Sequence, residues 1–191
     1  MPFSTDNASS CDWIGVDLNT TGYTAVVAHP ASGGVVMLGE REQAEDGCGG
    51  ASKRKKNRSR EQAFRRDQNQ RIAKEIVKMA RQLECGIKFE DLSGAGFAGR
   101  TKQSTPLPFS RREGSFYHLQ KLVEARAQSA GVRIVYVNPA FTSQRCSRCG
   151  EPGIRKGKRF SCPHCGYVVH ADANAAFNIA SAPPDAGTWV S

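Results

Sequence analysis

The sequence of 191 residues has no run of about 20 apolar residues, which is the length that a membrane-spanning helix requires. Its first residues, MPFSTDNASSCDW, also lack the positively charged lead and the apolar block of a secretory signal. From these two absences we expect a cytoplasmic protein with no membrane partner.

Acidic residues are scarce after residue 50. Residues 51–191 contain 26 basic and 11 acidic side chains, whereas residues 1–50 contain one basic and seven acidic ones. An excess of Lys and Arg raises the affinity for polyanions because binding releases condensed counterions. The basic part of the chain therefore indicates a nucleic-acid partner, although a solvated basic face would give the same composition.

The seven cysteines do not form the evenly distributed framework of a secreted, disulfide-bonded chain. Three of them stand alone and are expected to be buried or incidental thiols: Cys11, Cys48 and Cys85. The other four form two CxxC pairs, Cys146, Cys149, Cys162 and Cys165. Two such pairs supply the four tetrahedral ligands of one structural zinc ion and leave no open position for catalysis. A redox dithiol is the competing interpretation, and it explains only half of the pattern.

Apolar runs and turn residues predict an α/β fold. Short apolar runs with Gly, Ser and Pro between them indicate strands, and apolar positions at helical spacing indicate helices. The expected order is strands within 13–18, 24–30 and 35–38, a helix at 61–83, a strand at 87–92, a long loop at 94–112, a helix at 115–129, a strand at 132–139 and a helix at 171–180. A meander followed by alternating helices and strands predicts a mixed five-stranded sheet with flanking helices. Residues 1–11 are expected to be disordered and 183–191 to form a frayed tail.

Basic residues gather in two places that are candidates for contact with nucleic acid, and Arg100 in the long loop is a further candidate. The run KRKKNRSR is typical either of phosphate contact or of a solvated loop or helix start. Six further basic residues surround the paired cysteines, namely Arg145, Arg148, Arg155, Lys156, Lys158 and Arg159. The candidate contacts are Lys53, Arg54, Lys55, Lys56, Arg100, Arg145 and Arg148.

Three acidic residues stand where carboxylates can converge. Asp17 lies in an apolar strand, Glu90 ends another strand, and Asp172 opens the last helix. Divalent-metal nucleases need converging carboxylates because two cations have to be held about 3.5–4 Å apart. A charge within WIGVDL is costly unless it is paired, and metal coordination would offset that cost. Taken singly, Asp172 can be a helix N-cap and Glu90 can end its strand in solvent.

The segments around these acids resemble the TnpB family, which are transposon-encoded, RNA-guided endonucleases related to compact type V CRISPR effectors. The segments are GVDLN, KFEDLSG, SFYHLQKLVE, YVNPAFTSQRCSRCG and HADANAAFNIA, and together they span roughly residues 13–180. The resemblance implies an RNase H-like (RuvC) core at 12–140, a zinc-ribbon insert at 141–169 and a final RuvC helix at 170–182.

The resemblance also implies a mechanism. Asp17, Glu90 and Asp172 would hold two Mg²⁺ ions, for which Mn²⁺ could substitute. The reaction would be the hydrolysis of a phosphodiester bond in DNA. The implied partners are DNA and a guide RNA in a prokaryotic cytoplasm. His170 matches a family position without an assigned role, and Asn174 either orients the third acid or packs its helix.

Two departures from the family pattern stand out. Many relatives have Gly after the first motif, where this chain has Asn19. Relatives also carry an N-terminal half that contributes to guide-RNA binding and target recognition, whereas the first motif here lies close to Met1. We therefore expect a separate N-terminal recognition half, a truncated transposon remnant or a minimal nuclease. The alternative class is a module that binds nucleic acid without cutting it.

Overall fold

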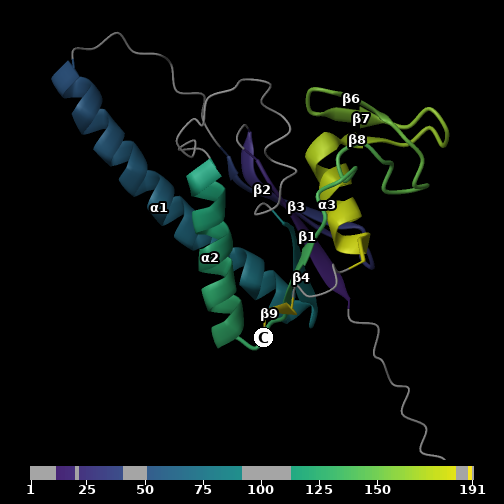
Figure 1. Ribbon diagram of the computed structural model, residues 1–191, viewed down its shortest axis with the longest axis horizontal. Coiled ribbons are helices and arrows are strands. Elements are labelled where there is room, and N and C mark those ends of the chain that lie inside the picture. The colour runs from purple at the N-terminus through teal and green to yellow at the C-terminus, as the bar shows by residue number, and fades with distance from the viewer. Residues whose placement is uncertain (1–11, 20–21, 41–50, 92–112, 184–188, 191) are drawn as a thin grey trace, which may run out of the picture.

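A six-stranded mixed sheet forms the centre of the molecule in the computed structural model, which describes residues 12–19, 22–40, 51–91, 113–183 and 189–190 (Figure 1). Its strands are β1 (Trp13–Leu18), β2 (Tyr23–His29), β3 (Gly34–Glu40), β4 (Gly86–Glu90), β5 (Ile134–Val137) and β9 (Trp189–Val190). Their order is β3-β2-β1-β4-β5-β9. β1 runs antiparallel to β2 and parallel to β4, which is parallel to β5. The predicted mixed sheet with its five strands is confirmed, and β9 adds a sixth.

β9 was not visible in the sequence. Its two residues pair antiparallel with β5, where Val190 lies opposite Ile134 and Trp189 opposite Val135. A strand of two residues is too short to show the alternation by which strands are recognised. The segment that was expected to fray therefore contributes an edge strand to the sheet.

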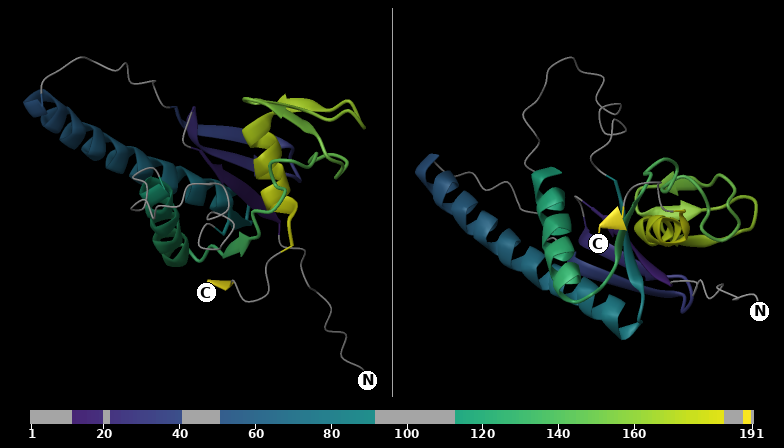
Figure 2. Two further views of the ribbon diagram at one scale, coloured as in Figure 1. Left: turned by 45° about the horizontal axis from the view of Figure 1, so that its top comes forward. Right: turned by 60° about the horizontal axis from the view of Figure 1, so that its bottom comes forward.

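Helices cover both faces of the sheet. α1 (Ala51–Gln82) and α2 (Glu113–Ser129) pack against each other on one face, and α3 (Ala171–Ser181) lies on the opposite face (Figures 1 and 2). Among the described residues, no helix has the length and apolar character needed to cross a membrane.

Only the C-terminal half of α1 packs on the sheet. Its buried apolar residues are Ile72, Ala73, Ile76, Val77 and Ala80, whereas residues 62–67 are exposed. The helix begins at Ala51, earlier than the sequence pattern predicted, so that the basic run is helical. Lys and Arg are good helix formers, but a solvated helix half carries no apolar periodicity to reveal it.

α3 lies directly on the central strand because Gly15 has no side chain. A Cβ atom at Gly15 would stand 2.0 Å from the carbonyl oxygen of Ala176 and 2.4 Å from the amide nitrogen of Ala180. The helix is rich in alanine, and eight of its eleven residues are buried. Small residues on both elements therefore let the two backbones approach closely, and this approach fixes where the first turn of α3 lies.

A small second sheet precedes α3. It consists of β6 (Ile154–Lys156), β7 (Arg159–Ser161) and β8 (Val168–His170), all antiparallel, in the order β6-β7-β8. The side chain of Phe160 is fully buried between this sheet and the cysteine segment. Because β8 leads directly into α3, the position of this sheet is tied to that of the helix (Figure 1).

Candidate metal centres and nucleic-acid interface

The three candidate acids lie at the end of the main sheet where the central strands β1 and β4 finish. β1 and β4 are parallel neighbours with Val16 opposite Phe89, so Asp17 and Glu90 follow at the same strand ends. Asp172 is in the first turn of α3, which packs on β1. Burial raises the pKa of Asp17 to about 8, and the negative charges of Glu90 and Asp172 add to this effect. The structure thus brings Glu90 and Asp172 close enough to Asp17 for their charges to act on it, and these three carboxylates form the acid edge.

Neighbouring side chains orient the first two acids. The side-chain amide of Asn19 donates to the Oδ2 atom of Asp17 at 2.9 Å. The hydroxyl of Thr142 donates to the Oε1 atom of Glu90. Neither contact was predicted: Asn19 was visible only as a departure from the family pattern, and Thr142 lies 52 residues after Glu90.

The third acid is held by two cations of the small sheet. Asp172 is fully buried, with Nη2 of Arg155 at 2.9 Å from its Oδ1 and Nζ of Lys158 at 2.6 Å from its Oδ2. These two basic residues were expected to face phosphate and instead neutralise a carboxylate. The N-cap of α3 is His170, so the interpretation of Asp172 as an N-cap is wrong. The Nδ1 atom of His170 is buried without a hydrogen-bond partner and lies 4.0 Å from Oδ2 of Asp172.

The four paired cysteines converge on one point. Their sulfur atoms all lie within 4.8 Å of one another, and two of the separations are 3.7 Å (Cys146 to Cys165) and 3.6 Å (Cys149 to Cys162). Four sulfurs around a zinc ion at about 2.3 Å would be about 3.8 Å apart. Within the described part of the chain this is the one group of three or more potential ligands that is so compact. The cluster can therefore hold one zinc ion, and Cys85 lies apart from it in the core.

Two asparagines connect the cysteine segment to α3. Asn174 accepts a hydrogen bond from the amide of Ser147 at 2.9 Å and donates to the carbonyl of Arg145 at 2.7 Å. Asn178 donates to the same carbonyl of Arg145 at 2.8 Å. These bonds flank Cys146, so the first cysteine pair is fastened to the helix that carries Asp172. The side chain of Asn174 thus binds the backbone of the cysteine segment.

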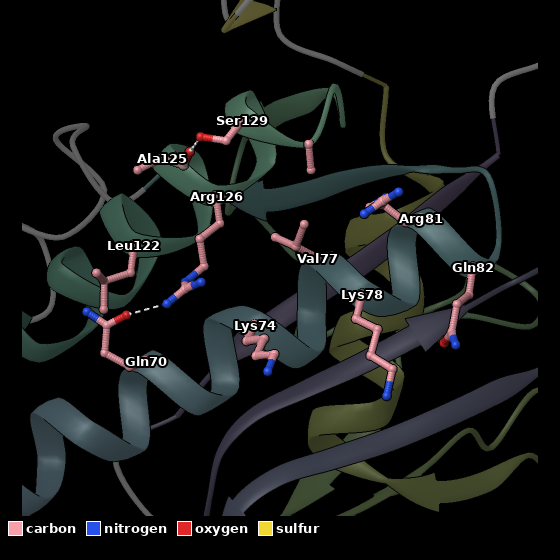
Figure 3. A pocket seen from close by; sticks show the side chains of 11 residues that line it. Gln70, Lys74, Val77, Lys78, Arg81, Gln82, Leu122, Ala125, Arg126 and Ser129 are labelled. Carbon is pink, nitrogen blue, oxygen red and sulfur yellow. Dashed lines mark hydrogen bonds between the residues drawn. The ribbon is translucent and has the colours of Figure 1, made fainter.

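A basic groove runs between α1 and α2, on the face of the sheet away from α3. Its volume is about 860 Å³, its floor includes Val77 and Leu122, and no acidic residue lines it. The basic residues along it are Lys74, Lys78, Arg81 and Arg126. Arg126 also donates to the side chain of Gln70 at 2.7 Å across the groove (Figure 3).

The predicted nucleic-acid contacts are only partly described. Arg145 and Arg148 are exposed on the cysteine segment. Lys53 to Lys56 lie in the first turns of α1, but their side chains fall outside the described part of the structure, as does Arg100. Of the predicted contacts, the structure therefore describes the side chains of Arg145 and Arg148, both on the cysteine segment.

Comparison with known proteins yields related sequences. Residues 116–179 match the family model of the Cas12f1-like TNB domain. The CRISPR-associated endodeoxyribonuclease Cas12f1 of Sulfoacidibacillus thermotolerans is 35% identical over 158 residues, which are 76% of this chain and 35% of that protein. A TnpB-like protein of Aquifex aeolicus is 37% identical over 124 residues, which are 59% of this chain and 39% of that protein. The chain thus spans little more than a third of the length of these relatives.

Comparison with solved structures yields the same fold. A cryo-EM structure of a CRISPR-Cas12f ternary complex superposes with a TM-score of 0.59 at 18% identity, covering 90% of this chain and 39% of the other. A cryo-EM structure of a Cas12f1–sgRNA–target DNA complex gives a TM-score of 0.57 at 20% identity, covering 88% and 49%. At these identities the likeness concerns the fold alone.

Proposed function

The chain belongs to the TnpB-like family of compact type V effectors, and on that premise we propose that it is a metal-dependent DNA endonuclease of the RuvC type. The convergence of Asp17, Glu90 and Asp172 at the acid edge carries the proposal. A buried carboxylate beside two others stays ionised at neutral pH only if a cation offsets the repulsion and the burial. Three carboxylates are hard oxygen donors, which suit Mg²⁺ or Mn²⁺.

In this proposal the three acids hold two divalent ions, which when bound supply an activated water and stabilise the leaving oxygen. Asn19 and Thr142 hold Asp17 and Glu90 in fixed orientations through their hydrogen bonds. Arg155 and Lys158 occupy both oxygens of Asp172. A divalent ion at Asp172 would therefore have to share these oxygens with the two basic side chains or displace one of them.

The rest of the chain would hold the acids in place and contact nucleic acid. Residues 12–140 and 170–182 form the RuvC core, and 141–169 form a ribbon around one structural zinc ion. Exposed basic residues of the ribbon and of the α1–α2 groove contact DNA or a guide RNA through phosphates. RNA guiding requires the portions of the relatives that lie outside the matched third, in the same or in a separate polypeptide.

A second candidate function is favoured by the pairing of Asp172. If both of its oxygens stay bound to Arg155 and Lys158, Asp172 takes no part in holding metal. Such a protein would be a module that holds nucleic acid without cutting it, as a transposon remnant would.

The two functions are separated by a cleavage assay. Labelled single-stranded and double-stranded DNA is incubated with the purified chain and Mg²⁺, with and without RNA from the native locus. We expect cutting that is lost in Asp17→Ala and Asp172→Ala. Asp67→Ala is the matched control because Asp67 is an exposed acid on α1, paired with Arg71 at 2.8 Å. DNA binding without cutting under every condition would refute the nuclease and favour the binding module.

A further inference from the structure

Phe141 occupies a conformation that neither burial nor backbone preference explains. It follows β5 in the turn that leads to the cysteine segment, and 57% of its surface is exposed. Its φ angle is 68°, in the left-handed region where glycine is favoured and a bulky side chain is an outlier. A large apolar side chain that is both exposed and strained is a starting point for a functional hypothesis.

The side chain of Arg145 lies over the ring of Phe141. The centre of its guanidinium lies 5.7 Å from the ring centroid of Phe141. The amide nitrogen of Arg145 also donates to the carbonyl oxygen of Phe141 at 3.1 Å, so the turn itself holds the two residues together. The pair presents an aromatic surface with a positive charge beside it.

A small cavity opens next to this pair. Its volume is about 240 Å³, and it is lined by the turn on one side and by α3 and the residues after it on the other. The lining includes Phe141, Arg145, Asn178 and Ala182, and none of the lining residues is acidic. An uncharged flat group attached to an anion fits such a site, because it can stack on the ring while the anion meets the arginine.

The cavity adjoins the acid edge through one residue. Thr142 lines the cavity, and its hydroxyl donates to Oε1 of Glu90. A base in the cavity would therefore belong to a nucleotide whose phosphodiester neighbours the proposed site of cutting. Aromatic side chains on which bases stack, with arginines beside them, are the usual means of holding single strands.

We propose that Phe141 and Arg145 form a stacking subsite for one base of a single-stranded nucleic acid at the acid edge. The position of the subsite beside the cut rests on the proposed nuclease function, whereas the stacking itself does not. The subsite reads no base edge, because stacking tolerates every base.

The test measures binding in the zinc-loaded full chain without added Mg²⁺, so that cutting plays no part. The probe is an oligothymidylate that carries one 2-aminopurine, whose fluorescence falls when the base stacks. Phe141→Ala should weaken binding about 5- to 100-fold, as expected for the loss of one stacked base, and abolish the quenching. Phe141→Trp should keep the affinity within about twofold, because the ring is retained.

Two further variants separate stacking from structure. Tyr117→Ala is the matched control: Tyr117 is 54% exposed and has Nζ of Lys121 5.4 Å from its ring centroid, but it lies on α2. Its affinity should equal that of the wild type. Phe141→Gly should have a melting temperature no lower than that of the wild type, because glycine suits the backbone conformation. Its binding should be as weak as that of Phe141→Ala, because the ring is absent.

The subsite is overturned if Phe141→Ala binds like the wild type, or if Tyr117→Ala weakens binding equally. The proposed subsite is also overturned if the wild type binds an abasic oligonucleotide as tightly as oligothymidylate. The same holds if the wild type binds neither oligonucleotide. Stacking that depends on Phe141 in a chain that never cuts would refute the nuclease alone. Cutting by a chain whose Phe141→Ala variant binds normally would refute the subsite alone.

Discussion

Asp17 is the residue at which burial and charge are in strongest conflict. Its side chain is 9% exposed, and burial together with Glu90 and Asp172 raises its pKa from 3.8 to about 8. The folded chain without divalent metal therefore binds a proton that the unfolded chain releases between pH 4 and 8. By linkage, its stability falls as the pH rises through this window.

Asp17→Asn should remove this dependence, because the amide has nearly the same shape and does not titrate. Each pKa unit of difference corresponds to about 1.4 kcal/mol, so the free energy of unfolding of the wild type should fall by several kcal/mol more than that of the variant. Urea unfolding at pH 5, 6, 7 and 8 without divalent metal measures this. Parallel pH profiles for the two proteins would contradict the assignment.

Lys88 is a buried cation that fastens the end of α3. Its Nζ atom donates to the carbonyl oxygens of Ala180 at 2.8 Å and Ala182 at 2.6 Å, and burial lowers its pKa. Carbonyls at a helix C-terminus have no partner within the helix, so the lysine satisfies groups that would otherwise be left without one.

Lys88→Met should lower the free energy of unfolding by about 1.5–3 kcal/mol, because the apolar chain fits and the charged hydrogen bonds are lost. Lys78→Met is the control, since the Lys78 side chain is 56% exposed and its loss should change stability by less than about 0.5 kcal/mol. Denaturant titration at pH 7 compares them. Equal stabilities of the two variants would show that the hydrogen bonds from Lys88 to the end of α3 contribute nothing to stability.

Among the elements, the contact between β1 and α3 tolerates the least change. Gly15→Ala would place a methyl group within 2.0 Å of a backbone oxygen of α3, so the helix has to move away from the sheet. We expect a loss of about 1–3 kcal/mol or more, as for other overpacked positions, and weaker binding of Mn²⁺ because Asp172 moves with the helix.

Gly34→Ala is the comparison for this substitution. A Cβ atom there would meet only the hydroxyl oxygen of Ser32 at 3.1 Å, the movable end of a side chain. Thermal unfolding and Mn²⁺ titration of both variants are the measurements. A Gly15→Ala protein with the melting temperature and the Mn²⁺ affinity of Gly34→Ala would rule out the close packing of α3.

If the acids hold metal as proposed, the β6–β7 hairpin competes with it, because Arg155 and Lys158 contact the oxygens of Asp172. Removing both cations with Arg155→Gln and Lys158→Gln leaves Asp172 buried and unpaired, which is destabilising. The double variant should melt below the wild type without metal, and Mn²⁺ should raise its melting temperature by more than it raises that of the wild type. Arg159→Gln, an exposed residue of the same hairpin, should behave as the wild type. Equal Mn²⁺ responses in all three proteins would exclude the competition.

At the scale of the whole molecule, the cysteine cluster and the acid edge share α3. Cys146→Ser should remove bound zinc and loosen the segment that Asn174 and Asn178 hold, whereas Cys85→Ala should keep one zinc ion per chain. Hydrogen exchange should then accelerate in the first turns of α3 more than in β2. Metal analysis and exchange mass spectrometry measure both effects, and unchanged protection of α3 in the zinc-free variant would show that the two centres are independent.

The sequence allowed the sheet and the positions of the acids to be predicted because both depend on local patterns. Asp17 lies near the end of one apolar strand and Glu90 ends another, and parallel strands bring their ends to the same side of the sheet. The pairing of Arg155 with Asp172 was not predictable, because it depends on how the hairpin folds back over α3. The early start of α1 and the short β9 were missed because neither carries an apolar period. The strain at Phe141 has no signal in the sequence.

The acid edge joins the first strand of the sheet to the last helix, and this has a consequence for the growing polypeptide. Domains fold as the ribosome releases them, from the N-terminus onward. β1, β2 and β4 can pair while α3 is still unmade, and the Gly15 face of β1 then stays open to water. Asp172 joins the other two acids only after the cysteine segment has emerged. A nascent chain that carries Asp17 and Glu90 therefore lacks the complete acid edge until Asp172 has been added to it.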